Sequence, residues 1–311
     1  MAQDKAKFRD PAVTATGEAR AQVALERLQT LWFNTGSLCN IECGHCYIES
    51  GPRNERLAYL SVGEVVTYLD EIAAAGLPTR EIGFTGGEPF MNRDILPMLE
   101  AALGRGFRAL VLTNAMQPMR RFEAGIAALA AGHGDRLTLR VSLDHYSQNV
   151  HDAERGAGSF AKSLEGIDWL NAQGVRIALA GRHFTAETEG ELRAGFARLI
   201  AQHGWKLDAD DPEALVIFPE MDADADVPEI TTACWSILGK SPSDVMCSSS
   251  RMVVKRNGAM HPVVLSCTLL AYDPQFELGR TLRQAARPVA LNHPHCAKFC
   301  VLGGASCSAR G

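Results

Sequence analysis

The chain has 311 residues, of which 46% are hydrophobic and 22% charged, and its net charge is -5 at pH 7. This composition predicts a soluble globular protein with ample apolar material for a core. The mild acidity and the lack of a lysine- and arginine-rich cluster argue against a nucleic-acid partner. No apolar run approaches the roughly 18 residues that span a bilayer, and the polar N-terminus lacks the apolar stretch of a signal peptide. We therefore expect a cytoplasmic protein with no membrane partner.

Residues 17–29 are compatible with a short helix. From residue 31 onward, short apolar segments alternate with amphipathic ones. Strands are expected at 31–34, 81–84, 107–112, 137–143, 175–180 and, with weaker support, 214–218. Helices are expected at 61–75, 93–103, 119–131, 159–172 and 187–202. Such alternation indicates an α/β fold with a parallel sheet, either an open doubly wound sheet or a full or partial barrel.

The pattern changes after residue 219. An acidic loop follows, and the remaining chain has few helical patterns. Asn257-Gly258 is a strong signal for a two-residue β-hairpin turn between the apolar pairs at 253–254 and 263–264. We therefore divide the chain into an N-terminal tail with a short helix (1–30), an α/β domain (31–219) and a small C-terminal domain with a hairpin (220–311).

Nine cysteines are many for a cytosolic chain, and they lie in two groups: three at 39–46 and six at 234–307. In a reducing compartment this count indicates metal binding or redox chemistry rather than disulfides. Cys39, Cys43 and Cys46 form a C-x3-C-x2-C motif directly after the first expected strand. Thiolates are the usual ligands of iron–sulfur clusters. A structural zinc site completed by His45 is the alternative for this motif alone.

The motif and its successors resemble the signature of the radical S-adenosylmethionine (SAM) superfamily. The three cysteines are followed by an aromatic residue, Tyr47, as in that family. The later family motifs occur in the same order at the ends of the next three strands: Gly86-Gly87-Glu88-Pro89, Thr113-Asn114 and Ser142-Leu143-Asp144. Residues 151–160 resemble the segment that follows the fourth strand in sulfatase-maturating and peptide-modifying relatives. The resemblance covers about residues 31–218.

The resemblance implies a partial (βα)6 barrel like an incomplete TIM barrel, with a [4Fe-4S] cluster held by the three cysteines. Glu88 would accept a hydrogen bond from the SAM ammonium group, and glycine would let the backbone approach the methionine moiety. Arg182 would face the SAM carboxylate, or else serve only in a salt bridge. The positions that the resemblance assigns to SAM binding are Tyr47, Gly86, Gly87, Glu88, Pro89, Thr113, Asn114, Ser142, Asp144 and Arg182.

In this family, one-electron reduction of the cluster cleaves SAM to methionine and a 5′-deoxyadenosyl radical, which abstracts hydrogen from the substrate. The resemblance therefore implies an enzyme with SAM and a [4Fe-4S] cluster as cofactors, which is either an oxidoreductase or the catalyst of another radical-mediated modification. It also implies an electron donor such as flavodoxin or ferredoxin.

The C-terminal cysteines resemble a second family feature, the short "twitch" form of the SPASM appendage, which holds one auxiliary [4Fe-4S] cluster. Two cysteines flank the expected hairpin and three follow it. Four of these five would be ligands: Cys247, Cys267, Cys296, Cys300 and Cys307. We favour the first four, with Cys307 as the main rival; zinc or scattered free thiols are the alternatives, and Cys234 is interpreted as a buried thiol.

Three functions remain open from the sequence. The N-terminal segment of about 30 residues is too short for a leader-peptide-binding domain, which favours an enzyme acting on a small molecule. The resemblance at 151–160 keeps open a maturase of a peptide or protein. The third hypothesis is a non-catalytic iron–sulfur or zinc protein, although such a protein needs no SAM pocket. Candidates for substrate contact or proton transfer are His145, Tyr146, His151 and Glu220.

Overall fold

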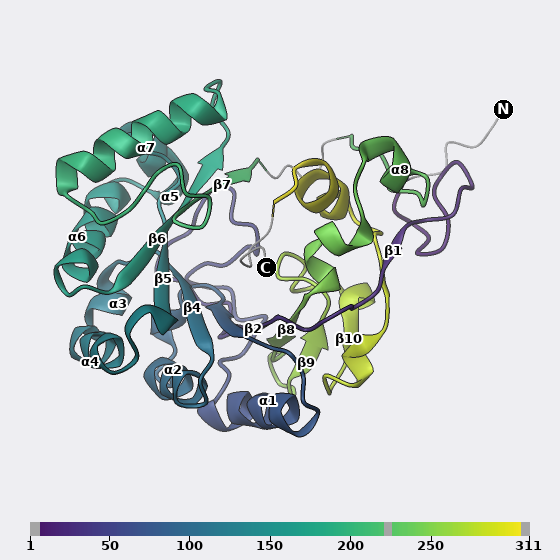
Figure 1. The fold of residues 1–311 in the computed structure, drawn as a ribbon, viewed down its shortest axis with the longest axis horizontal. Helices are drawn as coiled ribbons and strands as arrows, with labels where there is room; N and C mark the ends of the chain where they lie inside the picture. Colours follow the sequence, from purple (N-terminus) through teal and green to yellow (C-terminus); the bar gives the residue numbers. More distant parts are fainter. Residues whose placement is uncertain (1–6, 221–225, 306–311) are drawn as a thin grey trace.

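The computed structural model describes residues 7–220 and 226–305. Within these residues, nine strands form one sheet in the order β10-β9-β8-β2-β3-β4-β5-β6-β7 (Figure 1). Its strands are β2 (Thr30–Asn34), β3 (Glu81–Thr85), β4 (Arg108–Thr113), β5 (Leu137–Ser142), β6 (Arg176–His183), β7 (Leu215–Pro219), β8 (Ser250–Val254), β9 (Val263–Leu265) and β10 (Glu277–Gly279). A separate two-stranded pairing joins β1 (Gln22–Val23) and β11 (Val289–Ala290).

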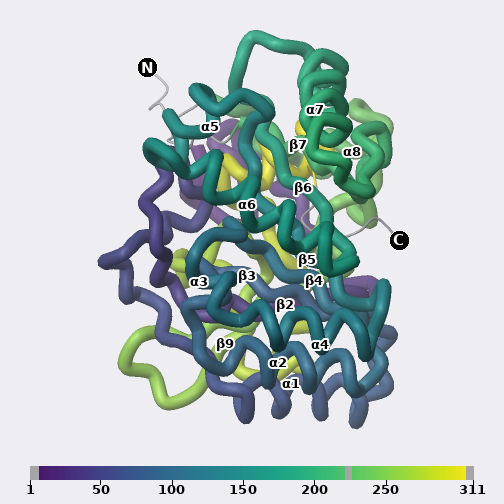
Figure 2. The backbone as a smooth tube through the Cα atoms, turned by 90° about the vertical axis from the view of Figure 1, so that its left-hand side faces the viewer, coloured from purple at the N-terminus to yellow at the C-terminus, as the bar shows by residue number. Residues whose placement is uncertain are grey.

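Strands β2 to β7 are consecutive parallel neighbours, as βα units require. The helices between them lie along the outer side of the sheet (Figures 1 and 2). They are α1 (Val62–Ala74), α2 (Ile95–Gly104), α3 (Gln117–Arg120), α4 (Glu123–His133), α5 (Gln148–Arg155), α6 (Ser159–Ala172) and α7 (Glu189–His203). The sheet has two edges, β10 and β7, in the described part of the chain, which confirms a partial rather than a closed barrel.

The predicted strands and helices of the barrel lie within a few residues of those observed. The capping box that opens α1 is present: the Ser61 hydroxyl accepts from the Glu64 amide at 3.3 Å, and the Glu64 carboxylate accepts from the Ser61 amide at 2.8 Å. The helix predicted at 119–131 is instead two helices, α3 and α4, separated by a turn at 121–122.

The C-terminal hairpin extends the barrel sheet, because β8 pairs in parallel with β2. The predicted hairpin is present, because Val253 pairs with Val264 and Val254 with Val263, but Asn257-Gly258 do not join these strands directly as a two-residue turn would. Gly258, with φ +78°, is the third residue of a turn closed by a bond from the Ala259 amide to the Arg256 carbonyl, within a longer connection between β8 and β9. This connection also bonds to the barrel, since the Asn257 amide donates to the Arg56 carbonyl. Tertiary contacts therefore replace the tight hairpin that the dipeptide favours locally.

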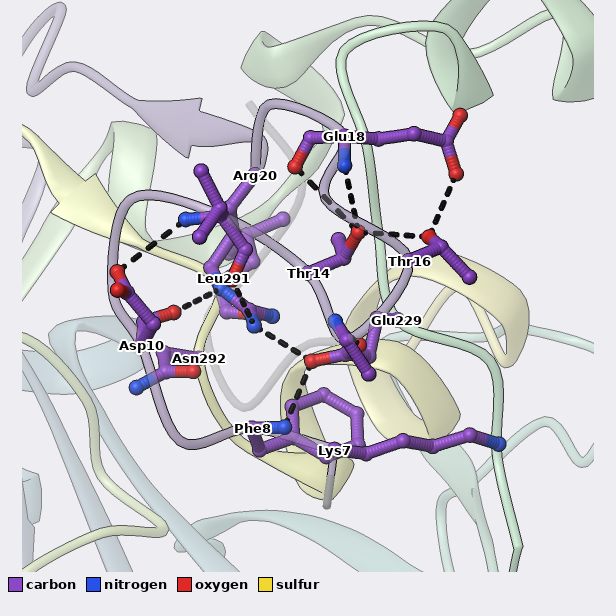
Figure 3. Close-up of polar contacts among 12 residues, drawn as sticks. Lys7, Phe8, Asp10, Thr14, Thr16, Glu18, Arg20, Glu229, Leu291 and Asn292 are labelled. Atoms are coloured by element: carbon purple, nitrogen blue, oxygen red, sulfur yellow. Dashed lines mark hydrogen bonds and ion pairs between the residues drawn. The ribbon is translucent and has the colours of Figure 1, made fainter. Parts of the chain in front are cut away.

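The helix predicted at 17–29 is also absent, because its backbone groups bond to distant segments. Strand β1 pairs with β11, and the Glu26 and Gln29 amides donate to the Ser248 and Ser249 carbonyls. Ahead of β1, the buried Arg20 guanidinium pairs with Glu229 and donates to the Asp10 and Leu291 carbonyls (Figure 3). The N-terminal segment is thereby attached to the C-terminal region of the molecule.

The C-terminal region also contains a short helix α8 (Cys234–Leu238) and a π-helix at Cys296–Leu302. Three-residue 3₁₀ turns occur at Pro89–Met91, Gly134–Arg136, Pro242–Asp244, Met246–Ser248, Pro274–Phe276 and Gln284–Ala286. Among the described residues, no helix is both long and apolar enough to cross a membrane.

Candidate active site

A cavity of about 170 Å³ opens at the carboxyl ends of the parallel strands, the usual place for a barrel active site. It contains most of the residues predicted to bind a cluster and SAM. Those predicted residues on its wall are Cys39, Cys43, Cys46, Tyr47, Gly86, Gly87, Thr113, Asn114, Ser142, Asp144 and Arg182. The sequence prediction therefore converges on a single cavity, although the role of each residue stays a prediction.

The three cysteines lie on an irregular loop that follows β2. The Cys39 amide donates to the Gly51 carbonyl at 3.1 Å, which closes this loop. The Ser50 amide points at the Cys46 sulfur, 3.3 Å away. Burial raises the pKa of Cys39 to about 12 and also raises that of Cys43. A bound iron cation reverses this tendency, because a coordinated thiol is deprotonated.

The glycine pair after β3 packs against the start of the cysteine loop. A Cβ atom on Gly87 would lie 2.0 Å from the Leu38 carbonyl oxygen, and one on Gly86, where φ is +140°, would lie 2.5 Å from the Gly36 carbonyl oxygen. The Gly87 amide donates to that Gly36 carbonyl at 2.8 Å. Both glycines are thus needed to seat the cysteine loop on the barrel, a reason that adds to any approach of SAM.

Glu88 and Pro89 do not line the cavity. Both carboxylate oxygens of Glu88 instead accept hydrogen bonds from the protein. The donors are the Thr113 hydroxyl at 2.8 Å, the Asn114 backbone amide at 2.9 Å and the Phe90 backbone amide at 3.1 Å. Burial raises the pKa of Glu88 to about 7, against the opposing effect of these donors. In this structure the carboxylate therefore orients two residues of the cavity wall, Thr113 and Asn114. Its contact with the SAM ammonium stays a prediction.

Two arginines, Arg155 and Arg182, also line the cavity. Arg155, which sequence reasoning missed, donates from Nε and Nη2 to the two oxygens of Asp144, both at 2.8 Å. Arg182 donates to Glu154 and Glu220, each at 2.8 Å, so its salt-bridge role is present. Burial alone would raise the pKa of Asp144, but Arg155 and then Arg182 hold it below its usual value.

Arg155 carried one available signal in the sequence. It closes the helix α5 within residues 151–160, the segment that resembles peptide-modifying relatives. Helix α5 precedes the longer helix α6, and the contact of Arg155 with Asp144 places the end of α5 beside the loop that follows β5. The spacing did not identify its partner, because Asp144 lies on the preceding loop.

Tyr47 lies between the barrel and the C-terminal region. Its hydroxyl donates to the Pro219 carbonyl at 3.0 Å, and its ring meets Phe218 and Phe299 edge to face. The guanidinium carbon of Arg182 lies 5.5 Å from the ring centroid. The ring therefore forms a wall between β7 and the π-helix that begins at Cys296.

The other candidate polar residues are not on the cavity wall. His145 is buried and Nε2 lies 2.8 Å from the Glu187 carboxylate, which also accepts from the Tyr146 hydroxyl at 2.5 Å. His151 is fully buried, and neither ring nitrogen has a hydrogen-bond partner among the described residues. Glu220 is bound by Arg182. His45, the alternative zinc ligand, is different: it does line the cavity, and its Nδ1 lies 3.0 Å from the Glu154 carboxylate.

Four of the five C-terminal cysteines line a second, apolar cavity of about 20 Å³: Cys247, Cys267, Cys296 and Cys300. Cys307 lies outside the described residues. Burial raises the pKa of Cys247 to about 11 and raises that of Cys296 further above the usual value of a thiol. His295 also borders this cavity, and Leu269 lines both cavities, so the two are adjacent.

In the described parts of the chain, no three His, Cys, Asp or Glu side chains converge on one metal ion. A single zinc ion needs its ligands within about 2.3 Å of one point. A cubane distributes its thiolates over different irons, so its ligands stand further apart. The two all-cysteine groups therefore suit iron–sulfur clusters in the kind of donor that they offer.

Comparison with known proteins identifies the class. The family model described as "Radical SAM superfamily" matches residues 33–193, more than half of the chain, and the chain belongs to that superfamily. It is therefore a radical SAM enzyme, whose cofactors are SAM and a [4Fe-4S] cluster.

Two curated relatives cover about half of this chain. The antilisterial bacteriocin subtilosin biosynthesis protein AlbA of Bacillus subtilis is 32% identical over 143 residues, 46% of this chain and 30% of AlbA. The AdoMet-dependent heme synthase of Oleidesulfovibrio alaskensis is 30% identical over 142 residues, 45% of this chain and 34% of that enzyme. The chain thus matches only about a third of the length of either relative.

Among solved structures, Streptococcus suis SuiB bound to S-adenosylmethionine aligns with a TM-score of 0.59 and 13% identity, over 82% of this chain and 63% of SuiB. This similarity extends well beyond the residues that the family model matches. It confirms the partial-barrel fold.

Proposed function

We propose that this chain is a radical SAM maturase that modifies a peptide or protein and holds an auxiliary [4Fe-4S] cluster in its C-terminal region. The observation that carries the proposal is the sharing of Leu269 by the two cavities. A substrate in the first cavity would therefore lie next to the cavity that the four cysteines line. This arrangement suits a reaction in which the substrate both loses a hydrogen atom and passes on an electron.

The choice of a peptide over a small molecule reverses the expectation from the sequence. AlbA is named for bacteriocin biosynthesis, and SuiB, which shares the fold, was also solved bound to its precursor peptide SuiA. A small-molecule substrate stays the second candidate, because the heme synthase is a relative of similar identity.

The chain's own residues have defined tasks in the proposed reaction. Bound at Cys39, Cys43 and Cys46, the reduced cluster supplies the electron that cleaves SAM. The glycine pair seats the cysteine loop, and Thr113 and Asn114, oriented by Glu88, form the adjoining wall. The apolar side chains of Tyr47, Phe218 and Leu269 keep water from the reacting atoms.

The test starts with anaerobic reconstitution with iron and sulfide, followed by reductant and SAM, and measures 5′-deoxyadenosine by chromatography. The wild type should form it, and the variant with Cys39, Cys43 and Cys46 all changed to Ala should not. Two substrate pools are then compared: short peptides encoded beside the gene, and the dialysable small molecules of a cell extract. Stimulated cleavage together with a mass change in a peptide supports the maturase. Stimulation by the dialysable pool alone supports the second candidate.

A further inference from the structure

Arg251 is a fully buried arginine that has no carboxylate partner. It lies on β8, between β9 and β2 in the sheet, and its side chain is among the largest that the fold excludes from solvent. Within the described residues, its guanidinium donates hydrogen bonds to backbone carbonyls: Cys247 at 2.6 Å, Ser250 and Ala285 each at 2.8 Å, and Arg287 at 3.3 Å. Within the described residues, no Asp or Glu lies within ion-pair distance of it.

Three other arginines with little exposed surface have carboxylate partners. Arg20 is paired with Glu229, Arg155 with Asp144, and Arg182 with Glu154 and Glu220. Carbonyl dipoles solvate a guanidinium, but they carry no net charge to balance it. Burying an unbalanced charge is costly, so a negative charge bound next to Arg251 would stabilise this region.

The cysteines of the second cavity lie next to Arg251 and would supply the negative charge that balances it. The shortest bond of its guanidinium goes to the carbonyl of Cys247, whose thiol lines the second cavity. When iron and sulfide bind, the four cysteines become thiolates, and a [4Fe-4S] cluster with four thiolates has a net negative charge. The net charge near such a cluster is one of the factors that set its reduction potential.

We propose that Arg251 is the counter-charge of the auxiliary cluster and holds its reduction potential above the value that the four cysteines alone would give. This inference rests on the auxiliary cluster of the proposed function. Arg251 is a positioning and tuning residue: it fixes the Cys247 carbonyl, and its charge favours the more negative, reduced state of the cluster.

The test measures the auxiliary cluster by itself. Cys39, Cys43 and Cys46 are changed to Ala in the full chain, so that only the second site can hold a cluster. The iron and sulfide contents are then measured by chemical analysis. The midpoint potential of the cluster is measured by a redox titration that is monitored by electron paramagnetic resonance. If this background holds no cluster, the auxiliary-cluster part of the proposed function is wrong, which is distinct from a failure of the role of Arg251.

Three variants are compared in this background. R251M removes the charge, R251K keeps the charge but not the planar set of donors, and R283M removes an exposed arginine from the segment next to Ala285. The expected result is a shift of the midpoint potential to more negative values in R251M, with R251K and R283M close to the background. Loss of the cluster in R251M but not in R251K also supports the proposal.

Other results overturn it. An intact cluster with an unchanged potential in R251M shows that the charge has no influence. Loss of the cluster in R251K, or a shift in R251K as large as that in R251M, shows that the hydrogen bonds alone matter. A shift in R283M equal to that in R251M shows a general effect of surface charge.

Discussion

Arg155 and Asp144 form a two-pronged ion pair on the cavity wall, with both N···O distances at 2.8 Å. The Asp144 side chain is almost entirely buried and that of Arg155 largely so. Removing one member of a buried pair costs about 3–5 kcal/mol when the other charge is left without a partner. Arg182 lies 3.7 Å from Asp144 and offsets part of that cost, so R155Q should lower the free energy of unfolding of the apoprotein by about 2–3 kcal/mol in a urea titration.

The matched control for this pair is exposed. Arg105 pairs with Asp70 at 2.9 Å on the surface, where such pairs contribute less than about 1 kcal/mol. R105Q should leave the urea midpoint nearly unchanged. Equal effects in the two variants would contradict a structural role for the Arg155 pair.

Gly87 and Gly63 give opposite predictions for the same substitution. G87A places a Cβ 2.0 Å from the Leu38 carbonyl oxygen, so the backbone before Cys39 must move, and we expect a loss of about 3 kcal/mol. G63A, in the first turn of α1, meets no atom within 4 Å and should be neutral or gain up to about 1 kcal/mol. Iron content after reconstitution should fall in G87A alone. Normal iron loading and stability in G87A would show that the loop does not depend on this contact.

The buried His151 should make the free energy of unfolding depend on pH. Burial, aided by Arg155, lowers its pKa to about 4 from 6.5. The unfolded chain binds the proton first, so this stability is complete above pH 6.5 and is lost as the pH falls toward 4. The loss approaches about 3 kcal/mol, at roughly 1.4 kcal/mol per unit of pKa shift. H151L should flatten the fall between pH 6.5 and 4 in urea titrations of the apoprotein.

At pH 7, H151L should also be no less stable than the wild type, because it removes two buried nitrogens that lack partners among the described residues. H261L changes an exposed histidine and should show the same dependence of the free energy of unfolding on pH as the wild type. A wild-type slope in H151L would show that another group is responsible for the dependence.

Cys296 and Cys234 separate a cluster ligand from a structural thiol. Cys296 lines the second cavity, whereas Cys234 lies outside it and accepts from the Thr231 amide at 3.4 Å. After reconstitution, C296A should lose the iron and the visible absorbance of one cluster, and C234A should match the wild type. Full iron loading in C296A would move the choice of fourth ligand to another residue, with Cys307 the first to test.

The regular part of the barrel was accessible from the sequence because its signals are local. Period-two and period-3.6 patterns, the capping box at Ser61 and the glycines after helices all act within a few residues. The motif residues were found in the same way, since each follows directly on a strand. Parallel strands then bring their carboxyl ends to one edge, which assembles the cavity without further information.

The errors arose where distant segments decide the local structure. Residues 17–29 have helical spacing, but their amides bond to segments near 230, 248 and 290. Asn257-Gly258 favours a tight turn, yet contacts with Arg56 and Leu57 hold it in a longer loop. The pairing of Arg155 with Asp144 could not be predicted either, because only the fold brings these two side chains together. The same holds for the lack of a carboxylate partner near Arg251.

The parallel pairing of β2 with β8 has a consequence for biosynthesis. Thr30 lies opposite Ser250, so the partner strand leaves the ribosome more than two hundred residues later. At a translation rate of about 5–20 residues per second, the outer edge of β2 stays unpaired for roughly 10–40 seconds before β8 is synthesised. During that interval the nascent barrel presents an unpaired strand beside the cysteine loop, and unpaired edges promote misassembly. The yield of native chain therefore depends on how well this edge is shielded until translation passes the hairpin.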